Sequence, residues 1–535
     1  MKYNTEAKII NKLTFKEYLS KVDGCWMGKN IGGTLGAPYE GARGLNNVTF
    51  YKDGENQSAL PNDDLDLQLV WLKAAEVHGK DVNAQILSDY WVTYITPHWD
   101  EYGICQQNLK LGLIPPLSGS FMNAYEASCG CFIRSELWAC LCPGHPELAA
   151  KYAYEDAIVD HANEGVYSEI FTAVLQSVAF IEKDVNKIIK IALSYVPEDC
   201  AIADVTKMVL AGKKNGLDWK EVRKQIYTKY PSTFGDYRGF EDREYEEWPK
   251  TSPYYNAICN VGFTILGIIY GEGDFAKTIC LCTNCGEDAD CSAATAGATL
   301  GILLGKENIP KEWLKPIGTE IKTVSIDNSL LWSIEVPKTT DELTQRVAKL
   351  MPRFLDNDFH FIDTDEMFIE YPDHAELPMR KRFLAVHDFV HFCQKQPQGI
   401  YLENDSFTVT VTFPENGPIV KASTPIDLKI ETTTNRFRQQ QMLECHLYLP
   451  EGFSSSLGTN FVINTYYNHH IAMALTNLTI TPPEMLDRQV YRGVLEITPM
   501  GKASSIYVPL RFVNNNTVLT ETEERYDPQF GKNKN

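Results

Sequence analysis

The stretch Cys285–Gly305, CGEDADCSAATAGATLGILLG, sets two closely spaced carboxylates, Asp288 and Asp290, before a run rich in alanine and glycine. Far earlier in the chain, the segment 62–72, NDDLDLQLVWL, sets Asp63 and Asp64 before another apolar, helix-like run. Desolvating an ionised carboxylate is expensive, so buried aspartates need partners. If the fold brings both clusters together, the resulting cleft is suited to hard, oxygen-binding cations such as Mg²⁺.

The small residues after Asp290 allow another element to come close. They are Ala293, Ala294, Ala296, Gly297, Ala298 and Gly301. Glycine in a helix interior costs about 1 kcal/mol relative to alanine, so a compensating contact is expected. Two explanations stay open at this point: close packing against a neighbouring helix, and a binding role.

The composition of the chain describes a soluble globular protein of more than one domain. Its 535 residues exceed one ordinary core, with 44% hydrophobic and 22% charged residues. A formal net charge of -20 argues against binding to nucleic acid or to anionic membranes, because both require a basic face. The first 26 residues have no apolar core of a signal peptide, and no stretch approaches the roughly 20 apolar residues of a membrane span. We expect a cytoplasmic location, with neither nucleic acid nor membrane as a partner.

The cysteines favour the same compartment. Twelve of the 14 precede residue 300, mostly inside apolar segments, so they are expected to be reduced, buried thiols. A structural zinc site is the alternative for the groups Cys129/Cys131, Cys140/Cys142 and Cys280/Cys282/Cys285. Their Cys-x-Cys pairs fit the usual ligand spacing of two to four residues poorly, so we do not predict zinc there.

The hydrophobic pattern changes its period near residue 400. Before it, Leu65, Leu69 and Leu72 follow a helical repeat, and the segments 169–181 and 260–270 are apolar nearly all round, as central helices are. After it, Phe407, Val409, Val411 and Phe413 alternate with threonines, as in a half-buried strand. Further strands are predicted at 426–432, 442–449, 490–498 and 505–513. We predict an all-α domain over 1–395, an antiparallel β-sandwich of immunoglobulin-like type over 396–515, and a polar tail over 516–535.

Three segments carry a resemblance to a known family. They are residues 24–41 (GCWMGKNIGGTLGAPYEG), the run NDDLDLQL, and GEDADCSAATAGATLG. In order and separation they resemble the opening loop and the two metal motifs of the ADP-ribosylglycohydrolase family. SCGCFIRSELW, residues 128–138, is a weaker match to a glycine-rich segment of that family. The resemblance covers roughly residues 15–320, and the β region has no counterpart in the simplest members.

The resemblance implies a mainly α protein: an orthogonal all-α bundle around a centre of two Mg²⁺ ions, with Mn²⁺ or another divalent cation as alternatives. Such an enzyme hydrolyses an N- or O-glycosidic bond to ADP-ribose, so its partner is an ADP-ribosylated protein or a small ribosyl compound. Carried over by position, the metal ligands are Asn62, Asp63, Asp64, Asp288, Asp290 and Cys291. Glu40 matches an acidic residue near the ribose, and Glu40 or Asp64 is the candidate base for an attacking water.

Three positions depart from the family pattern. Asn62 and Cys291 stand where threonine is usual, and Gly33 stands where aspartate is usual. A thiol is a poor ligand for Mg²⁺ and favours a softer metal. The acidic residues of the family pattern are retained, which favours catalysis over a non-catalytic ADP-ribose-binding protein. They are Glu40, Asp63, Asp64, Asp288 and Asp290. A different small glycoside or nucleoside-like substrate is the other alternative, and the oligomeric state is not constrained by the sequence.

Several of these residues also have a purely structural interpretation. A lone Asp63 or Asp64 is a common helix N-cap, and only the second cluster favours a metal role. Asp66 is interpreted as a solvated helix residue or as a partner of the ligands. His161 in DAIVDHANEGVY is interpreted as a core histidine. Arg134 fits either a phosphate contact or a structural ion pair.

Overall fold

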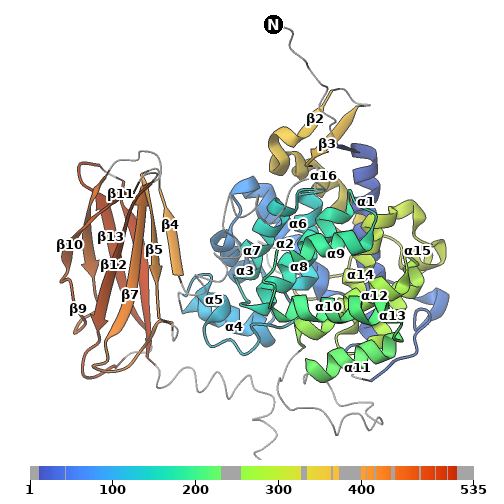
Figure 1. Cartoon of the computed structure of the whole chain (residues 1–535), viewed down its shortest axis with the longest axis horizontal. Coiled ribbons are helices and arrows are strands. Elements are labelled where there is room, and N and C mark those ends of the chain that lie inside the picture. Colours follow the sequence, from blue (N-terminus) through green and yellow to red (C-terminus); the bar gives the residue numbers. More distant parts are fainter. Residues whose placement is uncertain are drawn as a thin grey trace, which may run out of the picture. The chain divides into compact units, whose positions relative to one another are not determined.

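The computed structural model divides into two compact units (Figure 1), Met1–Glu101 with Ala124–Phe392, and Tyr102–Asn123 with Cys393–Asn535. It describes residues 11–42, 44–111, 113–230, 255–326, 334–362, 366–372, 399–404, 406–414, 417–434, 440–468, 471–487, 490–502 and 504–514. The predicted boundary at 395/396 and the predicted tail from 516 lie outside the described residues. Residues 102–123, which we placed in the helical domain, belong to the same unit as the β-strands.

The first unit is helical, in agreement with the predicted fold class. Its helices are α1 (Phe15–Gly36), α2 (Asp63–His78), α3 (Ala84–Tyr94), α6 (Glu136–Leu141), α7 (Pro146–Ala157), α8 (Glu164–Ala179), α9 (Val185–Leu193), α10 (Ala201–Lys214), α11 (Trp219–Lys229), α12 (Ala257–Gly271), α13 (Phe275–Cys285), α14 (Ala289–Leu304), α15 (Lys311–Ile317) and α16 (Thr340–Leu355). The apolar segments predicted as central helices lie in α8 and α12, and α12 is buried along its whole length.

Local sequence explains where the helices of the site begin and end. The Thr14 side chain and the Glu17 carboxylate form a reciprocal capping box at the start of α1. Asn62 caps α2, and α14 ends at Gly305, whose φ of 75° suits glycine. A small sheet, in the order β1 (Asn11–Thr14), β3 (Met367–Tyr371), β2 (Phe359–Phe361), completes this unit (Figure 1).

The second unit is a sandwich of two sheets. One sheet has the order β10 (Asn460–Asn464), β8 (Met442–Tyr448), β13 (Val490–Pro499), β14 (Ile506–Asn514), β6 (Ile419–Val420). The other has the order β11 (Tyr466–Asn468), β12 (Ile471–Thr481), β7 (Ile426–Thr434), β5 (Phe407–Thr412), β4 (Gly399–Glu403), with β9 (Ser454–Ser455) beside β12. Pairing is antiparallel except between β14 and β6. The predicted strands at 407, 426, 442, 490 and 505 are all present, within two residues at each end.

The core of the sandwich explains why residues 102–123 belong to this unit. Phe407, Val409 and Val411 are buried, as their alternation predicted. Leu113, Leu117 and Phe121, around the short helix α5 (Leu117–Ser120), share that core, and α4 (Asp100–Lys110) leads into it. No regular spacing of apolar residues in 102–123 indicates packing against strands, so the sequence did not predict it.

Among the described residues no helix combines the length and hydropathy needed to cross a bilayer.

Candidate metal centre

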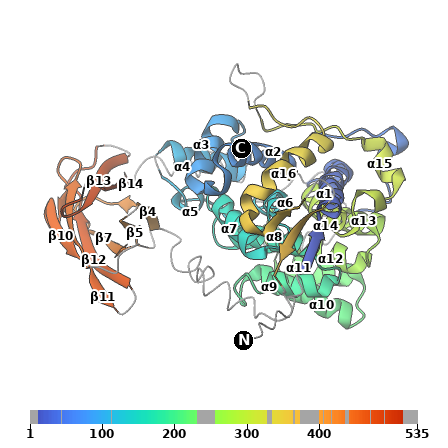
Figure 2. The same ribbon diagram turned by 90° about the horizontal axis from the view of Figure 1, so that it is seen from above.

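The helices α1 and α14 lie against one another through small residues (Figures 1 and 2). A methyl group on Gly28 would lie 2.5 Å from the Gly297 carbonyl carbon, and one on Gly32 would lie 2.5 Å from the Ala293 carbonyl carbon. Side chains there would force the two backbones apart. Of the two explanations for the small residues after Asp290, close packing is therefore the one that the structure supports.

This packing brings the end of α1 to the start of α14. At Gly36 a methyl group would lie 2.5 Å from the carbonyl carbon of Ala289. Just beyond α1, Gly41 N–H donates to the Glu287 carbonyl at 2.9 Å, and Glu287 N–H donates to the Ala42 carbonyl at 2.8 Å. These two hydrogen bonds fix the segment that carries Glu40 beside the segment that carries Asp288 and Asp290.

Among the described residues, two groups of ligand atoms result, and Asp290 belongs to both. Asp64, Asp290 and Cys291 form one group, and Glu40, Asp288 and Asp290 form the other. Within each group the atoms lie within 4.8 Å of one another. The two acidic clusters of the sequence thus meet in one place.

Unpartnered oxygens in this cluster fit a bound cation. Asp64 and Asp290 are 0% and 6% exposed, and in the described part of the chain Asp64 Oδ2 and Asp290 Oδ1 have no hydrogen-bond partner. Burial, followed by the neighbouring carboxylates Glu40 and Asp64, raises the pKa of Asp290 well above its ordinary value. Burial raises the pKa of Asp64 to about 7, although Lys29 opposes the shift. Carboxylates crowded in this way are stabilised by a divalent cation, and the donor set is one that such cations accept.

Glu40 differs from the buried carboxylates in its access to solvent. The residue as a whole is exposed, but its carboxyl group faces the cluster. Loss of solvent around the carboxyl, and then the charges of Asp288 and Asp63, raise its pKa to about 8. A carboxyl group with a pKa near neutrality, and within reach of water, can exchange protons during a reaction.

A buried lysine balances part of the negative charge. Lys29 Nζ, on α1, lies 3.2 Å from Glu136 Oε1 and 3.7 Å from Asp64 Oδ2, and all three side chains are fully buried. Burial lowers the pKa of Lys29, but the two carboxylates outweigh it and the net shift is upward. Gln68 and Gln176 each donate to the Glu136 carboxylate, at 2.9 and 3.0 Å. Lys29 is thereby held as a fixed cation beside Asp64.

The remaining predicted residues have distinct positions. Asn62 Oδ1 accepts a hydrogen bond from Asp64 N–H at 2.8 Å, so its amide oxygen serves as the cap of α2. The Asn62 amide fills the space beside Gly33, where a methyl group would lie 3.0 Å from Asn62 Cγ. The two departures from the family pattern, glycine at position 33 and asparagine at position 62, are therefore sterically coupled. Asp63 is half-buried and belongs to neither ligand group.

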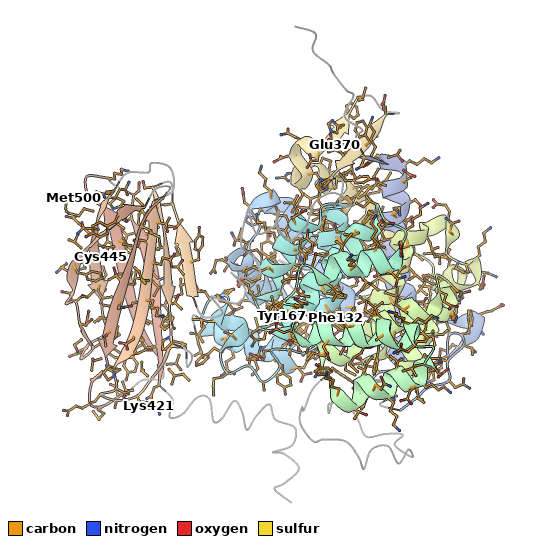
Figure 3. The ribbon with its side chains drawn as sticks, in the orientation of Figure 1. Phe132, Tyr167, Glu370, Lys421, Cys445 and Met500 are labelled. Carbon is orange, nitrogen blue, oxygen red and sulfur yellow. The ribbon has the colours of Figure 1, made fainter. Side chains whose placement is uncertain are left out.

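Three residues with open interpretations are structural. Asp66 is buried rather than solvated, and its carboxylate accepts the backbone N–H groups of Val324 and Ser325. Arg134 pairs with Asp156 at 2.9 Å and with Asp160 at 2.5 Å. Phe132, two residues earlier in the chain, is buried and is labelled in Figure 3. His161 is buried, with its Nδ1 2.9 Å from Asp160 Oδ1.

Sequence reasoning missed several neighbours of the cluster. Lys29, Asp100 and Tyr255 carry charge or a phenol close to it. Asp100 has a φ of 42°, a strained value that is enriched at functional sites, and its charge contributes to the raised pKa of Glu40. The sequence gives no local sign of that backbone conformation. The spacing of Lys29 within residues 24–41 would have been a usable sign, because a lysine amid small residues on a buried helix needs a carboxylate partner.

The cysteines agree with the prediction that they are reduced, buried thiols. Those in the described residues are free thiols, and all but Cys280 are buried. Cys291 alone among them joins a ligand group.

The mainly helical unit thus carries a buried cluster of carboxylates whose ligand atoms could hold a cation. The sequence profile of the family described as "ADP-ribosylglycohydrolase" matches residues 15–349. The chain belongs to this family. A solved structure titled "ADP-ribosylglycohydrolase-related protein complex" is similar at 18% identity and a TM-score of 0.41, over 63% of this chain and 98% of that chain. No curated protein matches.

Proposed function

We propose that the chain is a metal-dependent hydrolase that cleaves the glycosidic bond of an ADP-ribosyl or closely related ribosyl substrate. The family acts on such bonds, and the observation that supports the proposal in this chain is the sharing of buried Asp290 between two groups of ligand atoms. Asp64, Asp288, Asp290, Cys291 and Glu40 are the proposed holders of divalent cations. A bound cation would orient substrate hydroxyls and stabilise developing negative charge.

We assign proton transfer to Glu40 rather than to Asp64. Asp64 is wholly buried, and its Oδ1 accepts a hydrogen bond from the Cys291 thiol at 3.2 Å. Glu40 reaches solvent, so one of its carboxylate oxygens could take up a proton from water while the other faces the cations. Nearby carboxylates also stabilise the oxocarbenium-like transition state of ribosyl cleavage.

Hydrolysis of ADP-ribosylated peptides tests the proposal. Peptides with arginine-linked and serine-linked ADP-ribose are incubated with the wild type in Mg²⁺ and again after chelation, and free ADP-ribose is measured. We expect release that needs the cation and is lost in Asp288→Ala. Asp66→Asn is the matched control, because Asp66 is equally buried but holds the 324–325 backbone instead of facing the cluster.

The other outcomes separate the alternatives. Release that survives both chelation and Asp288→Ala would contradict the proposal. Tight binding of ADP-ribose without release from either peptide would instead indicate a binding protein. If only small ribosyl compounds were cleaved, the proposed metal centre would stand and the proposed ADP-ribosyl substrate would be wrong.

A further inference from the structure

We infer that the two cation positions of this centre are chemically unequal: Glu40, Asp288 and Asp290 bind a hard cation such as Mg²⁺, whereas Asp64, Asp290 and Cys291 bind a softer divalent cation such as Zn²⁺ or Co²⁺ through the Cys291 sulfur. The inference rests on the metal centre of the proposed function. It goes beyond that function by assigning a different class of ion to each position.

The sulfur is close enough to share a cation with the carboxylate beside it. Cys291 Sγ lies 3.2 Å from Asp64 Oδ1, and its thiol donates to that oxygen. Zinc bonds to sulfur and oxygen are about 2.3 and 2.1 Å, so two ligands at the tetrahedral angle on one ion are about 3.6 Å apart. The two atoms are therefore within about 0.4 Å of the separation of two ligands on a single ion, and cation binding would need only a small shift of the side chains.

The buried oxygens around the thiol show that its position is suited to a cation. Asp64 Oδ2 and Asp290 Oδ1 are shielded from solvent and have no hydrogen-bond partner among the described residues. Both carboxylates belong to the same ligand group as Cys291 Sγ. A buried carboxylate oxygen without a hydrogen bond is costly, even where Lys29 Nζ lies 3.7 Å from Asp64 Oδ2. A divalent cation bound by all three side chains would offset that cost.

The ligand types decide which ion each position prefers. The group of Glu40, Asp288 and Asp290 offers only carboxylate oxygens, which suit Mg²⁺. The group with Cys291 offers sulfur, which Mg²⁺ binds poorly and which Zn²⁺ and Co²⁺ bind well. Coordination replaces the S–H proton that Cys291 now donates to Asp64, and this proton leaves to solvent. Asp290, common to both groups, would bridge the two ions.

Cobalt titration of the full-length chain tests the inference without any substrate. In the presence of excess Mg²⁺, we expect one Co²⁺ per chain to produce the near-ultraviolet charge-transfer band of a cobalt–thiolate bond. Cys291→Thr should abolish this band and weaken cobalt binding at least about 10-fold, while Mg²⁺ binding measured by calorimetry persists. Cys129→Ser is the matched control, because the Cys129 thiol also lies beside Asp288 but belongs to neither ligand group. Its band should remain.

Absence of the band in the wild type would overturn the inference, and so would a band that persists in Cys291→Thr or that Mg²⁺ displaces. If Cys291→Thr fails to fold, the wild-type spectrum still shows whether cobalt binds a thiolate. Cys291→Ser then serves as a second, smaller replacement that tests whether the thiolate is that of Cys291. The readout is also independent of the proposed reaction. A thiolate band without ADP-ribose release would leave this inference standing and refute the substrate, and release without the band would do the reverse.

Discussion

Replacing Gly28 by alanine tests whether the close packing of α1 against α14 is what holds the acidic clusters together. A methyl group there would lie 2.5 Å from the Gly297 carbonyl carbon and closer still to its oxygen. Ordinary carbon–carbon contacts are about 3.5–4.0 Å, so the helices would have to separate by about 1 Å. Both clashing atoms are backbone, and no side-chain rotation relieves the contact.

The expected loss of stability follows from two opposing terms. Overpacking costs about 1–3 kcal/mol, and a clash with backbone belongs at the upper end of that range. Alanine regains about 1 kcal/mol of helix propensity over glycine. The free energy of unfolding of Gly28→Ala should therefore be about 2 kcal/mol below that of the wild type, measured by urea denaturation followed through the helical circular dichroism signal.

Gly262→Ala, on α12, is the matched control. Its added methyl group would meet only side-chain carbons of Ile226 and Val205, at 3.2 Å or more, so we expect its stability to lie within about 1 kcal/mol of the wild type. Gly28→Ala should also reduce turnover, because separation of the helices moves Glu40 relative to Asp290. A Gly28→Ala protein as stable and active as the Gly262→Ala protein would refute the reasoning.

Three further substitutions give independent outcomes in urea denaturation. Lys29→Met leaves the buried Glu136 carboxylate without its cation and should lower the free energy of unfolding by about 3–5 kcal/mol. Asn62→Ala removes the cap of α2 and should lower it by about 1 kcal/mol. Burial lowers the pKa of Lys21 to about 8, against about 10.4 in the unfolded chain. Between these values the unfolded state binds more protons, so stability rises with pH, and Lys21→Met should show a smaller rise over that interval.

Matched control variants exist for Lys29→Met and Asn62→Ala. Lys213→Met removes an exposed ion pair with Glu272 and should change the free energy of unfolding by less than about 1 kcal/mol. If Lys29→Met lost no more stability than Lys213→Met, the role of Lys29 as a buried cation would be contradicted. Asn62→Ser keeps a capping oxygen without adding charge and should lose less stability than Asn62→Ala; an equal loss in both would contradict the capping role of Asn62. Lys21→Met with the same pH dependence as the wild type would contradict the lowered pKa of Lys21.

The sequence predicted most of the fold because its signals are local. Helical and strand periodicities and the alternation from Phe407 to Phe413 are all contained in short windows. The assignment of residues 102–123 to the sandwich unit was missed. It depends on which core Leu113 and Phe121 join, and an apolar side chain in the sequence does not indicate which of two cores it packs into.

The candidate centre was predictable in its acidic residues and not in its support. Asp64 and Asp290 stand in short motifs whose order along the chain is informative. The partners of Lys29 lie 35 and 107 residues away, and the capping role of Asn62 depends on its rotamer beside Gly33. Such relations are set by tertiary packing, so the sequence could indicate the acidic residues of the candidate centre but not the charge balance around them.

The central claim is that the two acidic clusters form one functional centre, and Asp290→Asn tests it most directly, because Asp290 alone belongs to both ligand groups. Divalent cations bound per chain and ADP-ribose released from the peptides are measured on the same preparation. The account predicts that both fall together in Asp290→Asn, with folding retained by circular dichroism. Full turnover in Asp290→Asn, or turnover in a wild-type chain stripped of divalent cations, would contradict it.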